Sequence, residues 1–318
     1  MIKQRTIKNT IEVLGIGTHS GQNIKLRLQP APVNSGIVFH RSDLPGSEPI
    51  SVTPLNIGDT SFASTLAHGQ VKVATIEHLM ATLSGLGIDN LYIELDGPEV
   101  PIMDGSAISF VMLIQAAGIE EQDESKKFLR IKCPIEVQHG ASWVRLLPFN
   151  GCKLSFTLEY NHPVIGAMPK EATFNFATNS FIRDLSRART FGLLSDYEKL
   201  RAMNLAKGTN LSNVVVVDDT KVLNPEGLRY ANECARHKLL DALGDLYQLG
   251  FSFIGEFKAY RSGHALNNLL TRKLLEEKSS WELIDSKDLA FSGDGLADWL
   301  ENSFKELNRA VQTSGSLL

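Results

Sequence analysis

The strongest constraint on this chain is a recurring order of short alternating strands followed by helices. Alternating apolar and polar residues predict half-buried strands over residues 24–28, 91–95 and 143–147. Apolar residues at helical spacing predict helices over residues 75–86 and 232–249. Because this order occurs in both halves of the 318 residues, we predict an α+β protein with two domains of similar plan.

Residues 119–127 are the most charged and least apolar stretch, and we interpret them as the domain boundary. The predicted domains are residues 1–122 and 123–284, followed by a tail over residues 285–318 with one further helix.

Composition excludes several classes of protein. The chain has 32 Lys and Arg against 36 Asp and Glu, which argues against a general nucleic-acid binder. Its three cysteines are far apart, so a four-cysteine zinc site is excluded and a reducing compartment is expected. No apolar run reaches the ~18 residues needed to span a bilayer, and no signal peptide is visible. We therefore expect a cytoplasmic protein that is not an integral membrane protein. We also expect a monomer.

The strongest local signal is a pair of potential metal ligands on the second predicted helix. His237 and Asp241 are four residues apart, so their side chains meet over one turn and can bind one metal ion. Gly244 on the same face is expected to leave room for a ligand. For this pair alone, a solvated His–Asp pair on a surface helix is the simpler interpretation.

The first predicted helix opens on another pair, with Thr75 as its expected N-cap. His78 could be a metal ligand, and Glu77 could accept a proton from a metal-activated water. For this pair alone, a first-turn Glu favoured by the helix dipole, followed by an incidental His, is the simpler interpretation. His264 follows a Ser-Gly turn at another helix start, as a protonated catalytic histidine or a capping residue.

Together these residues are more specific than any pair. His78, His237 and Asp241 form the two-His, one-carboxylate set of zinc hydrolases, which leaves a fourth position for water. The HExxH motif is absent, which disfavours a thermolysin-like protease. The Gly-rich residues 15–21 match neither phosphate-binding pattern and are predicted to form a tight hairpin.

Five motifs in order carry a resemblance to a known family: TIEHL at 75–79, VPIMDGS at 100–106, SRARTFG at 186–192, HKLLDALGD at 237–245 and SGHALNN at 262–268. The set resembles the UDP-3-O-acyl-N-acetylglucosamine deacetylases, zinc amidases of lipid A synthesis. The resemblance implies two β/α domains, each a sheet packed on helices, with the helices between the sheets and the active site at the domain interface.

The resemblance also implies roles for the motif residues. His78, His237 and Asp241 would hold one zinc ion, with Fe²⁺ possible instead. Glu77 would take a proton from the attacking water. His264 would be protonated, and either it or Glu77 would deliver a proton to the leaving amine.

The remaining implied residues surround this centre. Thr190 would stabilise the oxyanion and Asp245 would orient His264 or a ligand. An insert over about residues 191–217 would form a passage for the acyl chain, lined by Phe191, Leu193, Leu194, Ala206, Val214 and Val216. The uridine diphosphate part of the substrate would meet Lys238, Tyr160 and Arg261.

The expected reaction is hydrolysis of the N-acetyl group of UDP-3-O-[(R)-3-hydroxyacyl]-N-acetylglucosamine, giving acetate and UDP-3-O-acyl-glucosamine in the committed step of lipid A biosynthesis. Two alternatives stay open. One is a zinc amidohydrolase acting on another N-acetyl sugar, and the other is a non-catalytic nucleotide-sugar- or lipid-binding relative.

Overall fold

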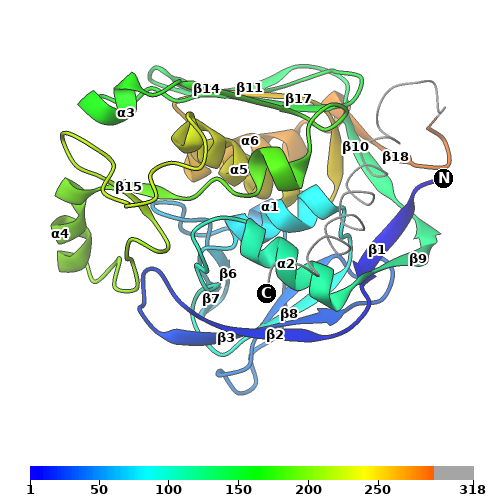
Figure 1. Ribbon diagram of the computed structural model, residues 1–318. Coiled ribbons are helices and arrows are strands. Elements are labelled where there is room, and N and C mark those ends of the chain that lie inside the picture. Colours follow the sequence, from blue (N-terminus) through cyan, green and yellow to red (C-terminus); the bar gives the residue numbers. More distant parts are fainter. Residues whose placement is uncertain (290–318) are drawn as a thin grey trace, which may run out of the picture.

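The chain folds into two β-sheets with helices between them, as the computed structural model describes for residues 1–289 (Figure 1). The first sheet has the strand order β2-β3-β8-β4-β5. Its strands are β2 (Ile11–Ile16), β3 (Asn23–Pro30), β4 (Ile37–Arg41), β5 (Ile50–Ser51) and β8 (Leu91–Leu95). The Gly-rich residues 15–21 form the end of β2 and the turn into β3, so the predicted hairpin is confirmed.

The second sheet is built around the long strand β17 (Ser252–Tyr260). Its path runs β11-β12-β17-β10-β18, and β13 joins β17 to β14. The other strands are β10 (Lys127–Ile131), β11 (Ile135–His139), β12 (Ser142–Leu147), β13 (Cys152–Thr157), β14 (Glu171–Asn175) and β18 (Trp281–Asp285). The predicted α+β architecture of two sheets with helices between them is confirmed.

Three two-stranded sheets complete the described strands. They pair β1 (Lys3–Ile7) with β9 (Ile119–Ser125), β6 (Leu66–His68) with β7 (Val71–Val73), and β15 (Phe191–Leu193) with β16 (Val215–Val217). The charged stretch interpreted as a boundary thus forms strand β9. Only Ser125, the last residue of β9, is fully buried. The other side chains of the strand are at least partly exposed, so its charged residues stay in contact with water.

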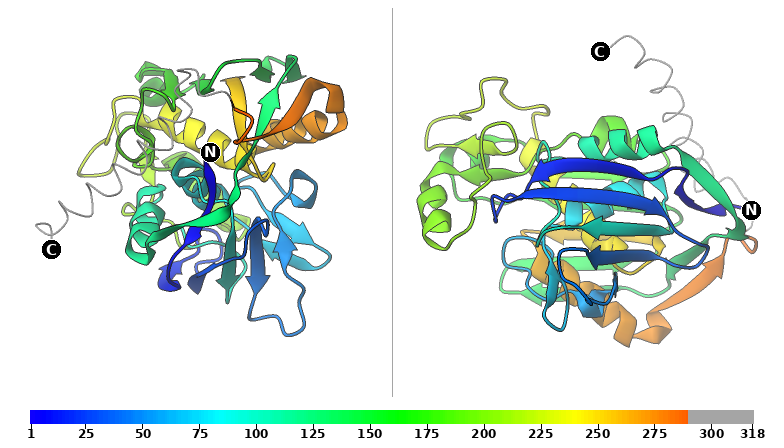
Figure 2. Two further views of the ribbon diagram at one scale, coloured as in Figure 1. Left: turned by 90° about the vertical axis from the view of Figure 1, so that its right-hand side faces the viewer. Right: turned by 90° about the horizontal axis from the view of Figure 1, so that it is seen from below.

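The four longest of the described helices form a layer between the two sheets. Helices α1 (Glu77–Leu86), α2 (Ile108–Ala117), α5 (Glu233–Tyr247) and α6 (His264–Glu276) lie between the sheets (Figure 1). The shorter helices are α3 (Pro163–Ala167), α4 (Leu194–Ala202), η1 (Pro54–Asn56), η2 (Phe181–Leu185) and η3 (Lys278–Ser280), of which η2 packs against α1 and α5. Helix α4 and the β15–β16 pair form one end of the molecule, as the right-hand view of Figure 2 shows.

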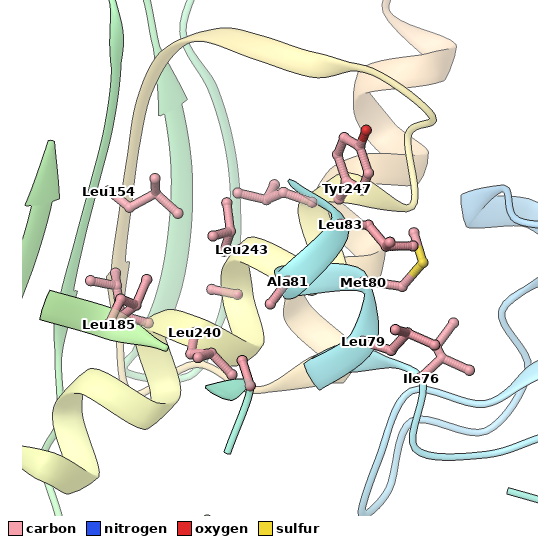
Figure 3. Packing of buried hydrophobic residues seen from close by; sticks show 14 of the residues in the cluster. Ile76, Leu79, Met80, Ala81, Leu83, Leu154, Leu185, Leu240, Leu243 and Tyr247 are labelled. Atoms are coloured by element: carbon pink, nitrogen blue, oxygen red, sulfur yellow. The ribbon is translucent and has the colours of Figure 1, made fainter. Parts of the chain in front are cut away.

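Every residue of helix α1 is buried, the polar Glu77 and His78 of its first turn included. Leu79 and Leu83 of α1 pack in the same core as Leu240 and Leu243 of α5 (Figure 3). Helix α1 begins at Glu77 with Ile76 as N-cap, so the predicted cap at Thr75 is wrong. Thr75 has φ +60°, and its hydroxyl points to Glu99 at 3.5 Å instead of to the first turn of the helix.

Gly244 serves helix packing and not ligand access, which corrects the sequence-based expectation. A Cβ at this position would lie 2.9 Å from the carbonyl carbon of Glu77 and 3.1 Å from the Ala81 nitrogen, and closer still to the Glu77 oxygen. The absence of a side chain therefore lets α5 touch the backbone of α1 at the turn that carries Glu77 and His78.

No helix within residues 1–289 combines the length and apolarity needed to cross a membrane. The helix predicted in the tail falls beyond residue 289 and so lies outside the described residues.

Candidate active site

The candidate site lies where the starts of two helices meet the middle of a third. Glu77 and His78 open α1, and His264 opens α6. His237 and Asp241 lie one turn apart on α5, which packs against both of these helices. Residues more than 150 positions apart in the sequence are thereby brought together, and all five side chains are buried.

His78, His237 and Asp241 form a compact group of potential metal ligands. Asp241 Oδ1 lies 3.4 Å from His78 Nε2 and 3.2 Å from His237 Nε2, and the three ligand atoms all lie within 4.8 Å of one another. His237 Nδ1 lies 3.0 Å from the carbonyl oxygen of Ala188, which directs its Nε2 toward the other two residues. The buried cluster excludes the interpretation as a solvated surface pair.

The protonation states of this group suit a cation. Burial lowers the pKa of His237 to about 3, so its imidazole is neutral and can offer a lone pair. Burial opposes ionisation of Asp241, but His237 and Lys238 outweigh it and hold the pKa of the carboxyl well below its usual value. Asp241 Oδ1 is buried without a hydrogen-bond partner among the described residues, as expected of an atom whose partner is a metal ion. The residues therefore fit a divalent transition metal.

Glu77 lies beside this group and is also removed from water. Its Oε2 accepts a hydrogen bond of 3.0 Å from the Ser64 backbone N–H, and its Oε1 lies 4.0 Å from His264 Nε2. Burial raises the pKa of Glu77, partly opposed by the neighbouring histidines. A carboxylate whose pKa is raised in this way is a better proton acceptor than an exposed one.

His264 is held by a carboxylate on its far side. Its Nδ1 lies 2.9 Å from Asp245 Oδ2, and this oxygen also accepts a 2.8 Å hydrogen bond from the Asn267 side chain. Burial opposes protonation, but the charge and hydrogen bond of Asp245 outweigh it and raise the pKa of His264 to about 9. The imidazole is therefore a cation at neutral pH, with its Nε2 directed toward Glu77 and Asp241.

A cavity of about 450 Å³ opens from these residues toward the end of the molecule that carries α4. Thr190 and Lys238 line it near the five central side chains, and the Lys238 ammonium donates a 2.8 Å hydrogen bond to Asp241 Oδ2. Beyond them the wall is mostly apolar. It includes every residue predicted for the acyl passage, namely Phe191, Leu193, Leu194, Ala206, Val214 and Val216.

The two other predicted nucleotide contacts do not line this cavity. The exposed Tyr160 ring packs edge-on against Phe191, with the ring centres 6.1 Å apart. Arg261 is exposed, and its backbone N–H donates to Thr157. Their roles toward a nucleotide stay predictions.

Several residues of the site were missed from the sequence. Thr18, His19 and Phe62 also line the cavity. Glu99 fixes the turn that carries His19, because its carboxylate accepts hydrogen bonds from the backbone of residues 19 and 20. These residues lie in turns and are not related by the spacing of a helix or a strand, so no sequence pattern identifies them.

One known protein family matches most of the chain. The sequence profile of the family described as UDP-3-O-acyl N-acetylglycosamine deacetylase matches residues 4–276. The chain belongs to this deacetylase family. The resemblance carried by the five motifs is thereby confirmed.

Curated relatives cover nearly the whole chain. A UDP-3-O-acyl-N-acetylglucosamine deacetylase of Acidithiobacillus ferrooxidans is 53% identical over 285 residues, 90% of this chain and 94% of the relative. The protein of the same name from Hahella chejuensis is 53% identical over 288 residues, covering 91% and 95%. That of Legionella pneumophila (strain Corby) is 52% identical over 282 residues, covering 89% and 93%.

Proposed function

We propose that this chain is a deacetylase that hydrolyses the N-acetyl group of UDP-3-O-acyl-N-acetylglucosamine, a step of lipid A biosynthesis. The observation that carries the proposal is the buried group of His78, His237 and Asp241, with Glu77 beside it, at the inner end of an apolar cavity. Hydrolytic groups next to an apolar passage suit a substrate with an amide and an acyl chain.

His78, His237 and Asp241 would hold the catalytic ion. Two imidazoles and one carboxylate are the donor set of catalytic zinc sites, and Fe²⁺ accepts the same set. When bound, the ion supplies a Lewis acid for the amide carbonyl and makes water more acidic.

The chain's own residues would then handle the protons and the developing charge. Glu77 accepts a proton from the water whose oxygen attacks the acetyl carbon. The Thr190 hydroxyl and the His264 cation stabilise the negative oxygen that forms. The C–N bond breaks as the amine nitrogen receives a proton from His264 or Glu77, and the products are acetate and the free amine.

Substrate binding would use both ends of the cavity. Lys238 would contact the polar part of the substrate, with Tyr160 and Arg261 nearer the uridine diphosphate. The acyl chain would lie along Leu193, Val214 and the other apolar residues of the wall. We further propose that the enzyme acts in the cytoplasm, which agrees with the free Cys133, Cys152 and Cys234, and that it acts as a monomer.

The experiment compares acetate release from UDP-3-O-acyl-N-acetylglucosamine and from UDP-N-acetylglucosamine. A buried methylene contributes about 0.8 kcal/mol, so even four of them predict a loss on the order of 10²-fold in kcat/KM for the substrate without the chain. Equal rates on both would favour an amidohydrolase for another N-acetyl sugar. No acetate from either substrate would favour the non-catalytic relative.

A further inference from the structure

Ser64 donates hydrogen bonds to Glu77 and to Asp245, the carboxylate that holds His264. It is 1% exposed and belongs to the loop between η1 and β6, far in sequence from α5 and α6. Its hydroxyl donates a 2.6 Å hydrogen bond to Asp245 Oδ1, across 181 residues of sequence. Its backbone N–H donates a 3.0 Å hydrogen bond to Glu77 Oε2.

The loop holds Ser64 in one place. Hydrogen bonds between Gly58 N–H and the Thr65 carbonyl, at 2.8 Å, and between Thr65 N–H and the Asp59 carbonyl, at 3.0 Å, close the loop at its base. The Ser64 carbonyl also accepts a 3.3 Å hydrogen bond from Ile76 N–H, directly before α1. Ser64 is therefore fixed to the start of α1 through its backbone and to α5 through its side chain.

Asp245 has no spare acceptor capacity in this arrangement. Its Oδ2 receives His264 Nδ1 and the Asn267 side chain, and its Oδ1 receives Ser64 Oγ and, at 3.2 Å, the Gln248 side chain. The bond from the hydroxyl to the carboxylate is the shortest of the four, as charge-assisted O–H···O⁻ bonds are. It is therefore the strongest single restraint among the four hydrogen bonds that fix the rotation of the carboxylate that orients His264.

We propose that Ser64 is a positioning residue of the reaction, which fixes the His264–Asp245 pair relative to Glu77. The inference rests on the deacetylase function proposed above. Without the hydroxyl, the Asp245 carboxylate loses its shortest hydrogen bond, so its orientation is less tightly restrained, and the side-chain bond between Ser64 and α5 is lost. Glu77 and His264 would then sample separations at which they no longer act on the same bond.

The test is Ser64→Ala in the full-length, metal-loaded enzyme. We expect kcat to fall about 10–100-fold, the range typical for residues that orient a functional group, with KM within about twofold of the wild type. Metal content should stay unchanged, and the melting temperature should fall only by the few degrees that the loss of one buried hydrogen bond causes. Ser64→Thr keeps the hydroxyl and should restore most of kcat. The matched control is Ser61→Ala, in the same loop, whose exposed hydroxyl bonds only Asp59 within the described residues.

A second measurement separates positioning from general support of the fold. If Ser64 acts through Asp245, then Ser64→Ala should add little to the loss caused by Asp245→Asn. The inference would be overturned if the kcat losses of the two single variants multiplied in the double variant, or if Ser64→Ala had wild-type kcat. It would also be overturned if missing metal or unfolded protein explained the loss in Ser64→Ala. A wild-type enzyme that releases no acetate would instead refute the proposed function.

Discussion

Gly244→Ala is predicted to destabilise the protein, whereas Gly→Ala in a helix usually stabilises it. In an exposed helix, Gly→Ala stabilises by about 1 kcal/mol because it restricts the unfolded chain. Here the new methyl group would lie 2.9 Å from the Glu77 carbonyl carbon and 3.1 Å from the Ala81 nitrogen. Since these are backbone atoms, no side-chain rotation can relieve the clash, and the two helices must separate.

The magnitude follows from two opposing contributions. Overpacking costs roughly 1–3 kcal/mol, and a backbone clash belongs at the upper end of that range. Subtracting the gain of about 1 kcal/mol in helix propensity leaves a net destabilisation of about 2 kcal/mol. The displacement falls on the turn that carries Glu77 and His78, and a shift of about 1 Å at such a site can cost ~100-fold in turnover.

The assay combines denaturant unfolding, metal affinity and kcat for Gly244→Ala, with Gly85→Ala as control. Gly85 lies on α1, the helix that carries Glu77, but about two turns beyond Glu77, where the methyl group would meet the Phe181 ring. Both variants should lose stability, and only Gly244→Ala should also weaken metal binding and turnover. Wild-type metal affinity and kcat in Gly244→Ala would refute the reasoning.

Two further predictions concern single carboxylates. Glu77→Gln keeps the shape but cannot accept a proton, so kcat should fall roughly 10²–10⁴-fold with metal content unchanged, and loss of the metal in this variant would contradict the role of base. Burial opposes ionisation of Asp104, but Arg229 at 2.8 Å and the hydroxyls of Ser106 and Ser109 hold its pKa below the usual value. Because the folded pKa is the lower one, this stabilisation is present above about pH 4 and is lost as the pH falls through the folded pKa. Unfolding measured from pH 7 to pH 3 should therefore show a stability difference between wild type and Asp104→Asn that is constant above about pH 5 and shrinks below about pH 4, and a difference that grows toward low pH would contradict the assignment.

The sequence predicts the regular elements well where local pattern and burial agree. Strand β8 occupies the predicted residues 91–95, and helix α1 ends at the predicted Leu86, followed by Gly87 in the left-handed conformation. Prediction fails where long-range contacts decide. Thr75 faces Glu99 across the bridge that joins Ala74 to Glu99, and this contact is invisible to a local capping rule.

The same division holds for the site. His237 and Asp241 are recognisable because a helix brings residues four apart together, and His78 and Glu77 because they open a helix. Ser64 and His19 are not related to the other site residues by helical spacing, because only the folding of their loops brings them to the site. Gly244 was misinterpreted for a related reason, because a missing side chain on the ligand face can accommodate either a substrate or another helix.

Metal analysis of the purified protein is the most direct test of the central claim. We predict about one zinc or iron ion per active chain, and loss of both the metal and acetate release in His237→Ala, while the exposed His139→Ala control keeps both. Full metal content in His237→Ala, or full deacetylase activity in a protein that contains no metal, would contradict the account.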